Sequence, residues 1–200
     1  MIIAVVNTKG GVGKTSTAML MAEAAGRAGY TSVVLDADPQ GSASEWAEIA
    51  QDEVGGIKRF TVTSVNRANL AKVAGRATED WVFIDTPTGD ATAITAAAEI
   101  ADFVIIPTSP KPGDFHRALQ TYNAISSAPA GLLFCHWNKR STKNFADAQA
   151  IVEEQDISAF ISTVPNREAI DRFWFSDPST GDLQGYQDAF TELSQALKNK

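Results

Sequence analysis

Short runs of apolar, mainly β-branched residues alternate with longer stretches of mixed polarity along the whole chain. The apolar runs occupy residues 2–6, 32–36, 57–63, 81–85, 103–107, 131–137 and 159–164. Several are apolar at consecutive positions, which is typical of strands covered on both faces. The stretches between them predict helices over residues 14–28, 42–52, 66–77, 90–100, 114–126, 144–155, 166–174 and 183–198.

This alternation predicts an α/β fold. We expect a mainly parallel, twisted sheet of about seven strands, with helices on both faces and right-handed crossovers between successive strands. A chain of 200 residues is close to the usual size of one domain, and the sequence contains no internal repeat and no linker-like segment. Residues 1–200 are therefore expected to form a single domain.

Composition and charge narrow the class of protein. The chain carries 17 Lys and Arg residues against 24 Asp and Glu residues, and this net charge of −7 argues at first against nucleic-acid binding. The single cysteine, Cys135, excludes a disulfide framework and any metal cluster that needs two thiolates from one chain. Cys135 and His136 are adjacent in a predicted strand, so they point to opposite faces and core packing is expected for both. The four tryptophans are scattered in sequence, and we expect no stacking platform from them.

The sequence shows no sign of a membrane segment. No stretch reaches the roughly 18 consecutive apolar residues of a membrane span, and the N-terminus lacks the layout of a signal peptide. The last predicted helix is amphipathic through Tyr186, Phe190, Leu193 and Leu197, but it lacks the basic polar face of a membrane-surface helix. We therefore expect this helix to pack on the sheet of a cytoplasmic protein.

A glycine-rich turn follows the first predicted strand and opens the first predicted helix. Its sequence is Lys9-Gly10-Gly11-Val12-Gly13-Lys14-Thr15-Ser16. Such a turn directs backbone N–H groups inward at a helix N-terminus, which favours phosphate binding. Lys14 is expected to bind the β- and γ-phosphates, and the Thr15 hydroxyl to ligate Mg²⁺. The ordinary phosphate-loop pattern requires glycine at position 8, where this chain has Thr8.

The pattern that fits, K-G-G-x-G-K-[ST]-[ST], resembles the deviant Walker A loop of the ParA/MinD family of dimeric ATPases. This resemblance implies an ATPase that forms a homodimer on binding ATP and Mg²⁺. It also implies that Lys9 reaches into the partner's site, as an arginine finger does; the alternative is an ordinary solvated loop lysine. The implied nucleotide-binding residues of the loop are Gly10, Gly11, Val12, Gly13, Lys14, Thr15 and Ser16.

Two carboxylates follow the second predicted strand, in the run Asp36-Ala37-Asp38-Pro39-Gln40-Gly41. The resemblance implies that Asp38 positions the attacking water and joins Lys9 and Lys14 in catalysis, while Asp36 supports the Mg²⁺ site. The alternative is that both are turn or capping residues before the helix at 42–52, a position that Ser42 would cap equally well.

The strand at 81–85 ends in Asp85, which is the layout of a Walker B strand. A carboxylate at this position holds Mg²⁺, usually through water, and we expect Asp85 to do so. The following segment, Thr86-Pro87-Thr88-Gly89-Asp90, resembles the switch that senses the γ-phosphate. A strand-end aspartate that only caps the next turn is the alternative.

The family resemblance also implies a site for the adenine base, formed by an asparagine after the sixth strand and a proline-containing loop after the seventh. The matching residues are Asn138, Pro165 and Asn166. Arg167, which follows them, is expected to face either DNA or solvent.

The resemblance is strongest to short ParA proteins that partition plasmids or chromosomes. It implies a nucleoid-associated bacterial ATPase that binds DNA nonspecifically as an ATP dimer and is released when a ParB-type adaptor protein stimulates hydrolysis. Because no helix-turn-helix precedes Met1, operator-specific repression is not expected. A MinD-like membrane-associated positioning ATPase and a metabolic ligase or kinase are the alternatives, whereas relatives that need several cysteines are excluded.

The charge distribution modifies the first reading of the net charge. Residues 54–78 contain five basic and no acidic residues, and residues 115–146 contain four basic and none acidic. They form a candidate DNA-binding surface or, alternatively, ordinary solvated faces, and the sequence leaves open whether they meet. The candidate DNA-binding residues are Lys58, Arg59, Arg67, Arg117, Lys139, Arg140, Lys143, Arg167 and Arg172.

Overall fold

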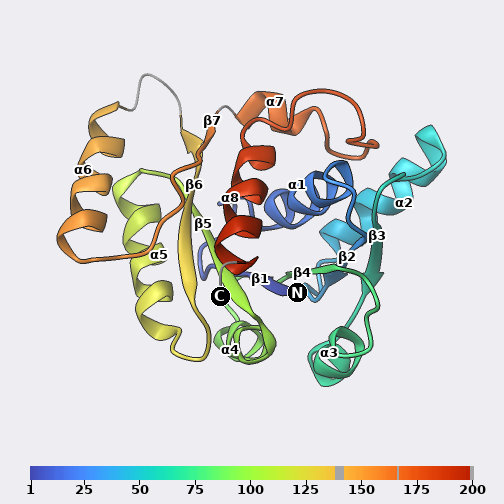
Figure 1. The fold of residues 1–200 in the computed structure, drawn as a ribbon, viewed down its shortest axis with the longest axis horizontal. Helices are drawn as coiled ribbons and strands as arrows, with labels where there is room; N and C mark the ends of the chain where they lie inside the picture. Colours follow the sequence, from blue (N-terminus) through green and yellow to red (C-terminus); the bar gives the residue numbers. More distant parts are fainter. Residues whose placement is uncertain (138–141, 166, 199–200) are drawn as a thin grey trace.

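The computed structural model describes residues 1–137, 142–165 and 167–198, and its strands form one parallel sheet (Figure 1). The order of strands across the sheet is β3-β2-β4-β1-β5-β6-β7. The expected fold, a parallel seven-stranded sheet with helices on both faces, is confirmed. The strands are β1 Ile2–Val5, β2 Ser32–Asp36, β3 Thr61–Ser64, β4 Trp81–Asp85, β5 Phe103–Thr108, β6 Ala130–Trp137 and β7 Val164–Pro165.

Helices cover both faces of this sheet. In β2, Val34 belongs to the core beneath α1, α2 and α8, whereas its neighbours Val33 and Leu35 belong to the core beneath α3, α4, α5 and α6. Both faces of each central strand are therefore buried beneath helices, which explains the continuous apolar runs in the sequence. The helices are α1 Lys14–Arg27, α2 Ser42–Val54, α3 Arg67–Ala74, α4 Ala91–Ile100, α5 Pro112–Ala124, α6 Thr142–Glu154, α7 Arg167–Asp171 and α8 Tyr186–Lys198.

The C-terminal helix α8 packs its apolar side into the molecule, as expected. Tyr186, Phe190 and Leu193 are buried, and the Phe190 ring lies edge-on to Trp81 of β4 at a centroid distance of 4.9 Å. In the part of the chain that the structure describes, no helix has the length and apolar character needed to cross a membrane.

The two edge strands are shorter than the sequence pattern predicts. Leu132 of β6 pairs with residues 158–160, but the carboxylate of Glu192 then accepts the backbone N–H groups of Ile161 and Ser162 at 2.8 and 2.9 Å. These two amides are thereby removed from the ladder, and β7 is confined to Val164–Pro165. At the other edge, β3 begins only at Thr61.

The order of the strands brings three predicted site elements together. β1 lies between β4 and β5, and the register pairs Val5 and Asp36 with Asp85 from either side. The loops after β1, β2 and β4 therefore leave the sheet side by side at its carboxyl edge. In open α/β sheets this edge is where ligands bind.

Candidate nucleotide site

The loop between β1 and α1 has the backbone shape of an anion-binding turn. Gly11 and Gly13 adopt positive φ values of 71° and 97°, a region that favours glycine. A Cβ on Gly13 would also lie 3.1 Å from the Nε2 atom of His136. Helix α1 begins directly afterwards at Lys14, so its first backbone N–H groups face the loop and are suited to phosphate oxygens.

Neighbouring elements hold this loop in place. The Asn7 side chain donates to the Pro107 carbonyl at 2.9 Å, and its Oδ1 accepts the Lys9 amide at 2.9 Å. The hydroxyls of Thr8 and Thr121 lie 3.3 Å apart, which joins the loop to α5. Because the loop is shaped by these contacts, little ordering is needed when a ligand binds.

Lys14 directs its charge into the site. The side chain is buried, and Nζ donates to Thr88 Oγ1 at 2.7 Å and to the Lys9 carbonyl at 3.4 Å. Burial lowers the pKa of Lys14, while the charges of Asp85 and Asp38 oppose that shift. Through Thr88, Lys14 thus links the phosphate loop to the 86–90 segment.

Thr15 and Asp85 form a pair suited to a hard divalent cation. The Thr15 hydroxyl donates to Asp85 Oδ2 at 2.7 Å. The other oxygen, Oδ1, is buried and has no hydrogen-bond partner among the described residues. Burial raises the pKa of Asp85 to about 7, against the lowering effect of the Thr15 hydrogen bond. A buried carboxylate oxygen without a partner, next to a hydroxyl, fits Mg²⁺, which favours oxygen ligands and keeps several waters.

Asp36 and Asp38 differ in their surroundings. Asp36 is buried, and its Oδ2 accepts both the amide and the hydroxyl of Ser44, at 2.8 and 2.7 Å, while Oδ1 accepts the Asp38 amide at 3.2 Å. These bonds hold the loop between β2 and α2. Asp38 is less buried, lines the cavity beside the phosphate loop and accepts the Gln40 amide at 2.9 Å. The geometry therefore suits Asp36 to supporting the loop and Asp38 to contacting a ligand.

The phosphate loop opens into a cavity of about 540 Å³. The structure brings three further residues to it that sequence reasoning missed, His136, Asp171 and Trp174. Core packing holds for Cys135 but is wrong for His136, because the register of β6 with β7 shifts there and His136 has a φ of 56°. The sequence did contain one sign that His136 could reach the site: it lies near the carboxyl end of a predicted strand, where ligands bind in open α/β sheets. The complete lining is Gly11, Gly13, Lys14, Thr15, Ser16, Asp38, Gln40, Ser42, Thr88, His136, Asp171 and Trp174.

Two of the four scattered tryptophans meet in space. The rings of Trp46 and Trp174 stack at a centroid distance of 4.9 Å, although they are far apart in sequence. Of the expected base-binding residues, Pro165 ends β7 and is half-buried. Asn138 and Asn166 lie outside the described residues.

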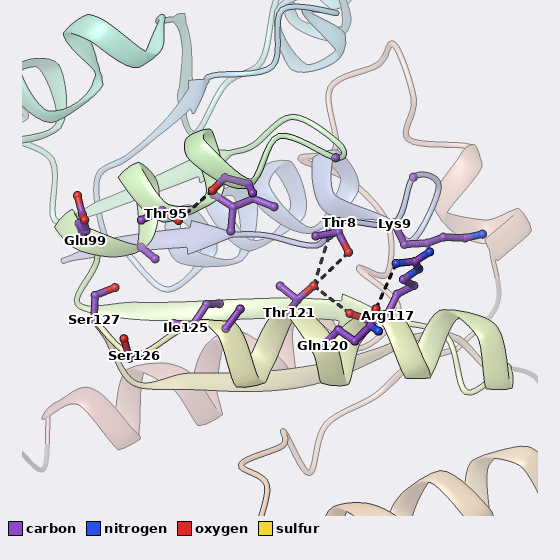
Figure 2. Close-up of a pocket in the computed structure, with 16 residues that line it drawn as sticks. Thr8, Lys9, Thr95, Glu99, Arg117, Gln120, Thr121, Ile125, Ser126 and Ser127 are labelled. Atoms are coloured by element: carbon purple, nitrogen blue, oxygen red, sulfur yellow. Dashed lines mark hydrogen bonds between the residues drawn. The ribbon is translucent and has the colours of Figure 1, made fainter.

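Lys9 does not line this cavity but lies at one end of a second one, where its side chain extends outward (Figure 2). Its side chain is 48% exposed, and Nζ lies 3.7 Å from Asp114 Oδ1. The second cavity, of about 680 Å³, is a groove between α4 and α5. Figure 2 shows Lys9 and Arg117 at one end of it and Glu99 at the other. Lys9 therefore lies on the exposed side of the phosphate loop, accessible to another molecule.

Two of the candidate DNA-binding residues make ion pairs within the chain. Lys58 Nζ lies 3.5 Å from Asp177 Oδ2, and Arg59 Nε lies 3.6 Å from the buried carboxylate of Glu23. Burial raises the pKa of Glu23 in spite of the nearby guanidinium groups. Arg59 thus makes a structural contact that no local sequence pattern predicts.

The two basic stretches lie at opposite ends of the molecule. Residues 54–78 include β3 and α3 at one edge of the sheet, while residues 115–146 include α5, β6 and the start of α6 near the other edge (Figure 1). Four strands separate β3 from β6, so the stretches do not meet within one chain. Arg67, Arg117, Lys143 and Arg172 are exposed; the Arg167 side chain, Lys139 and Arg140 lie outside the described residues.

The fold and this site together define a phosphate-loop nucleotide-binding protein of the α/β class. The family model for the CobQ/CobB/MinD/ParA nucleotide-binding domain matches residues 3–174. The chain is 34% identical over 176 residues to maintenance of carboxysome distribution protein A from Gloeobacter kilaueensis, covering 86% of this chain and 79% of that protein. It belongs to the CobQ/CobB/MinD/ParA family.

Solved structures show the same fold at low sequence identity. The structure of pNOB8 ParA bound to nonspecific DNA superposes with a TM-score of 0.74 at 16% identity, covering 100% of this chain and 99% of that one. The cell-division ATPase MinD of Pyrococcus furiosus superposes with a TM-score of 0.77 at 15% identity, covering 98% of each chain. The fold is that of the ParA/MinD ATPases.

Proposed function

We propose that this chain is a DNA-partitioning ATPase of the ParA type. It dimerises on binding ATP and Mg²⁺, binds DNA without sequence preference, and is released when a ParB-type adaptor stimulates hydrolysis. One observation carries the proposal: the two lysines of the phosphate loop point in different directions. Lys14 is buried in the chain's own cavity, whereas Lys9 is about half exposed on the outer side of the loop.

Different residues of the cavity bind ATP and promote its hydrolysis. Backbone N–H groups from Gly10 to Ser16 and the Lys14 ammonium bind the phosphates, while Thr15 and Asp85 hold Mg²⁺. Asp38 positions the attacking water, and Asp36 keeps the Asp38 loop in place. ATP supplies the phosphoanhydride bond that is cleaved. Lys9 from the partner adds positive charge to the phosphates, as an arginine finger does.

Dimerisation couples this site to DNA. Arg67 and Lys72 are exposed on α3 and Arg76 just after it, and Arg117 and Lys143 are exposed at the other end of the molecule. A dimer doubles each group of charges and joins them in one particle, which raises the affinity for a polyanion without any new contact. Binding that is favourable only in the dimer makes DNA affinity depend on the nucleotide.

DNA binding measured as a function of salt tests this function. With Mg²⁺ and a slowly hydrolysed ATP analogue, we expect the chain to bind random-sequence duplex at low salt, with an affinity that falls steeply as salt rises. Without nucleotide we expect binding at least about tenfold weaker. The matched control is Lys9→Ala, which should bind the nucleotide but remain monomeric and bind DNA weakly. Nucleotide-independent DNA binding, or none at low salt, contradicts the proposal.

The name of one relative favours a second candidate cargo, a carboxysome instead of a plasmid or chromosome. Because the Gloeobacter kilaueensis relative is named for carboxysome distribution, the same ATP cycle would serve here to distribute a protein-bounded particle over the nucleoid. Both versions place the chain in the bacterial cytoplasm on DNA. For the MinD-like alternative, ATP-dependent sedimentation with anionic vesicles is the discriminating result. For a ligase or kinase, it is a monomer in size-exclusion chromatography with the ATP analogue.

A further inference from the structure

Two tryptophans from distant parts of the chain meet at the rim of the nucleotide cavity. Trp46 of α2 is fully buried, and its Nε1 donates to the Ser176 carbonyl at 2.8 Å. Trp174, which follows α7, is half-buried and stacks on Trp46, with 28° between the ring planes. One face of the Trp174 indole is therefore covered by a fixed aromatic neighbour.

The same indole lines the cavity that contains the phosphate loop. Trp174 shares this 540 Å³ cavity with Gly13, Lys14 and Ser16. The Phe175 ring lies nearly perpendicular to the indole, at a centroid distance of 5.6 Å and an angle of 71°. An indole carries no charge to neutralise phosphate, but its π-face suits a planar, uncharged group. Within one cavity, phosphate-binding groups thus lie together with an aromatic wall.

The segment that carries Trp174 is tied down at several points. Arg27 of α1 donates to the carbonyls of Pro178 and Gly181 at 2.7 and 2.8 Å. The Ser176 hydroxyl donates to the Phe173 carbonyl at 2.9 Å. Because these contacts hold the segment before any ligand arrives, stacking on Trp174 costs little additional ordering.

We infer that Trp174, supported by Trp46, contacts the nucleoside part of the bound nucleotide and sets the preference for a nucleotide over a bare triphosphate. The inference rests on the proposed function, since it takes ATP as the ligand of this cavity. It adds a contact beyond Asn138, Pro165 and Asn166. Stacking accepts any planar base, so Trp174 contributes affinity for the nucleoside and not a choice among bases.

Binding of two ligands, ATP and inorganic tripolyphosphate, tests this role by calorimetry in the presence of Mg²⁺. We expect Trp174→Ala to weaken ATP binding by about tenfold, which equals ~1.4 kcal/mol. Tripolyphosphate binding should stay within about twofold of wild type, which also shows that the variant is folded. Trp174→Phe keeps an aromatic face and should retain ATP affinity within about threefold.

Tryptophan fluorescence gives a second measurement. ATP is expected to change the emission of the wild-type protein, and tripolyphosphate is not. Trp174→Phe should lose this response. The matched control Trp81→Phe should keep it, because Trp81 is buried in β4 against Phe190.

Three results would overturn the inference. If Trp174→Ala binds ATP with wild-type affinity, the inference about Trp174 is wrong and the proposed function still stands. An equal loss of affinity for ATP and tripolyphosphate shows that Trp174 only supports the phosphate loop, which also overturns it. A wild-type protein that binds neither ligand removes the proposed function as well.

Discussion

Replacing Asp38 with alanine is expected to lower the rate of ATP hydrolysis by about 100-fold while leaving ATP-dependent dimerisation intact. Asp38 lines the cavity beside Lys14 and Thr88, whereas the Thr15 and Asp85 pair that we assign to Mg²⁺ does not involve it. Loss of a group that orients or deprotonates the nucleophile typically costs 10²- to 10⁴-fold in rate. Phosphate release measures turnover, and size-exclusion chromatography with light scattering measures the dimer.

The control for this variant is Asp52→Ala, which removes one exposed carboxylate from α2 and so changes the net charge equally. It should leave both turnover and dimerisation unchanged. If Asp38→Ala abolishes the dimer together with turnover, Asp38 acts in nucleotide binding or at the dimer interface, and its assignment to the water-positioning step is wrong.

Replacing Gly185 with alanine is expected to destabilise the protein by more than about 3 kcal/mol. Gly185 has a φ of 93°, and a Cβ there would overlap the carbonyl oxygen of Thr163. The overlap is with backbone next to β7, so a side-chain rotation cannot relieve it. A clash that displaces backbone adds to the 1–3 kcal/mol cost of an unfavourable φ. Urea denaturation followed by circular dichroism measures the effect.

The chain offers a matched control for the backbone conformation alone. Gly29 has a similar φ of 87°, and a Cβ there would meet nothing within 4 Å. Gly29→Ala should therefore cost only about 1–2 kcal/mol, the price of a left-handed conformation. Equal destabilisation of the two variants would show that close approach to Thr163 contributes nothing.

Local sequence predicts the phosphate loop and most element boundaries well. Helix α1 begins at Lys14, where the pattern places it, because a glycine turn between an apolar strand and a helix depends only on adjacent residues. Asp85 ends β4 for the same reason. By contrast, β7 is shorter than predicted because the Glu192 carboxylate, distant in sequence, takes two of its amides.

Contacts between residues on distant elements were beyond sequence reasoning. Trp46 and Trp174 are far apart in sequence, and only the placement of α2 next to the segment after α7 lets them stack. His136 was assigned to the core because a regular strand alternates its faces, and the register shift in β6 breaks that rule. Arg59 reads as a surface cation until α1 brings the buried Glu23 beside it.

The sequence by itself determined the α/β class, the glycine-rich loop with its additional Lys9, and the position of Asp85 at the end of an apolar strand, because each depends on periodicity or on neighbouring residues. Only the tertiary structure decided which side chains complete the cavity and that Lys14 is buried while Lys9 lies near the surface. It also placed the two basic stretches at opposite ends of the sheet. These features depend on the spatial order of the strands, which is fixed by contacts between residues far apart in the chain.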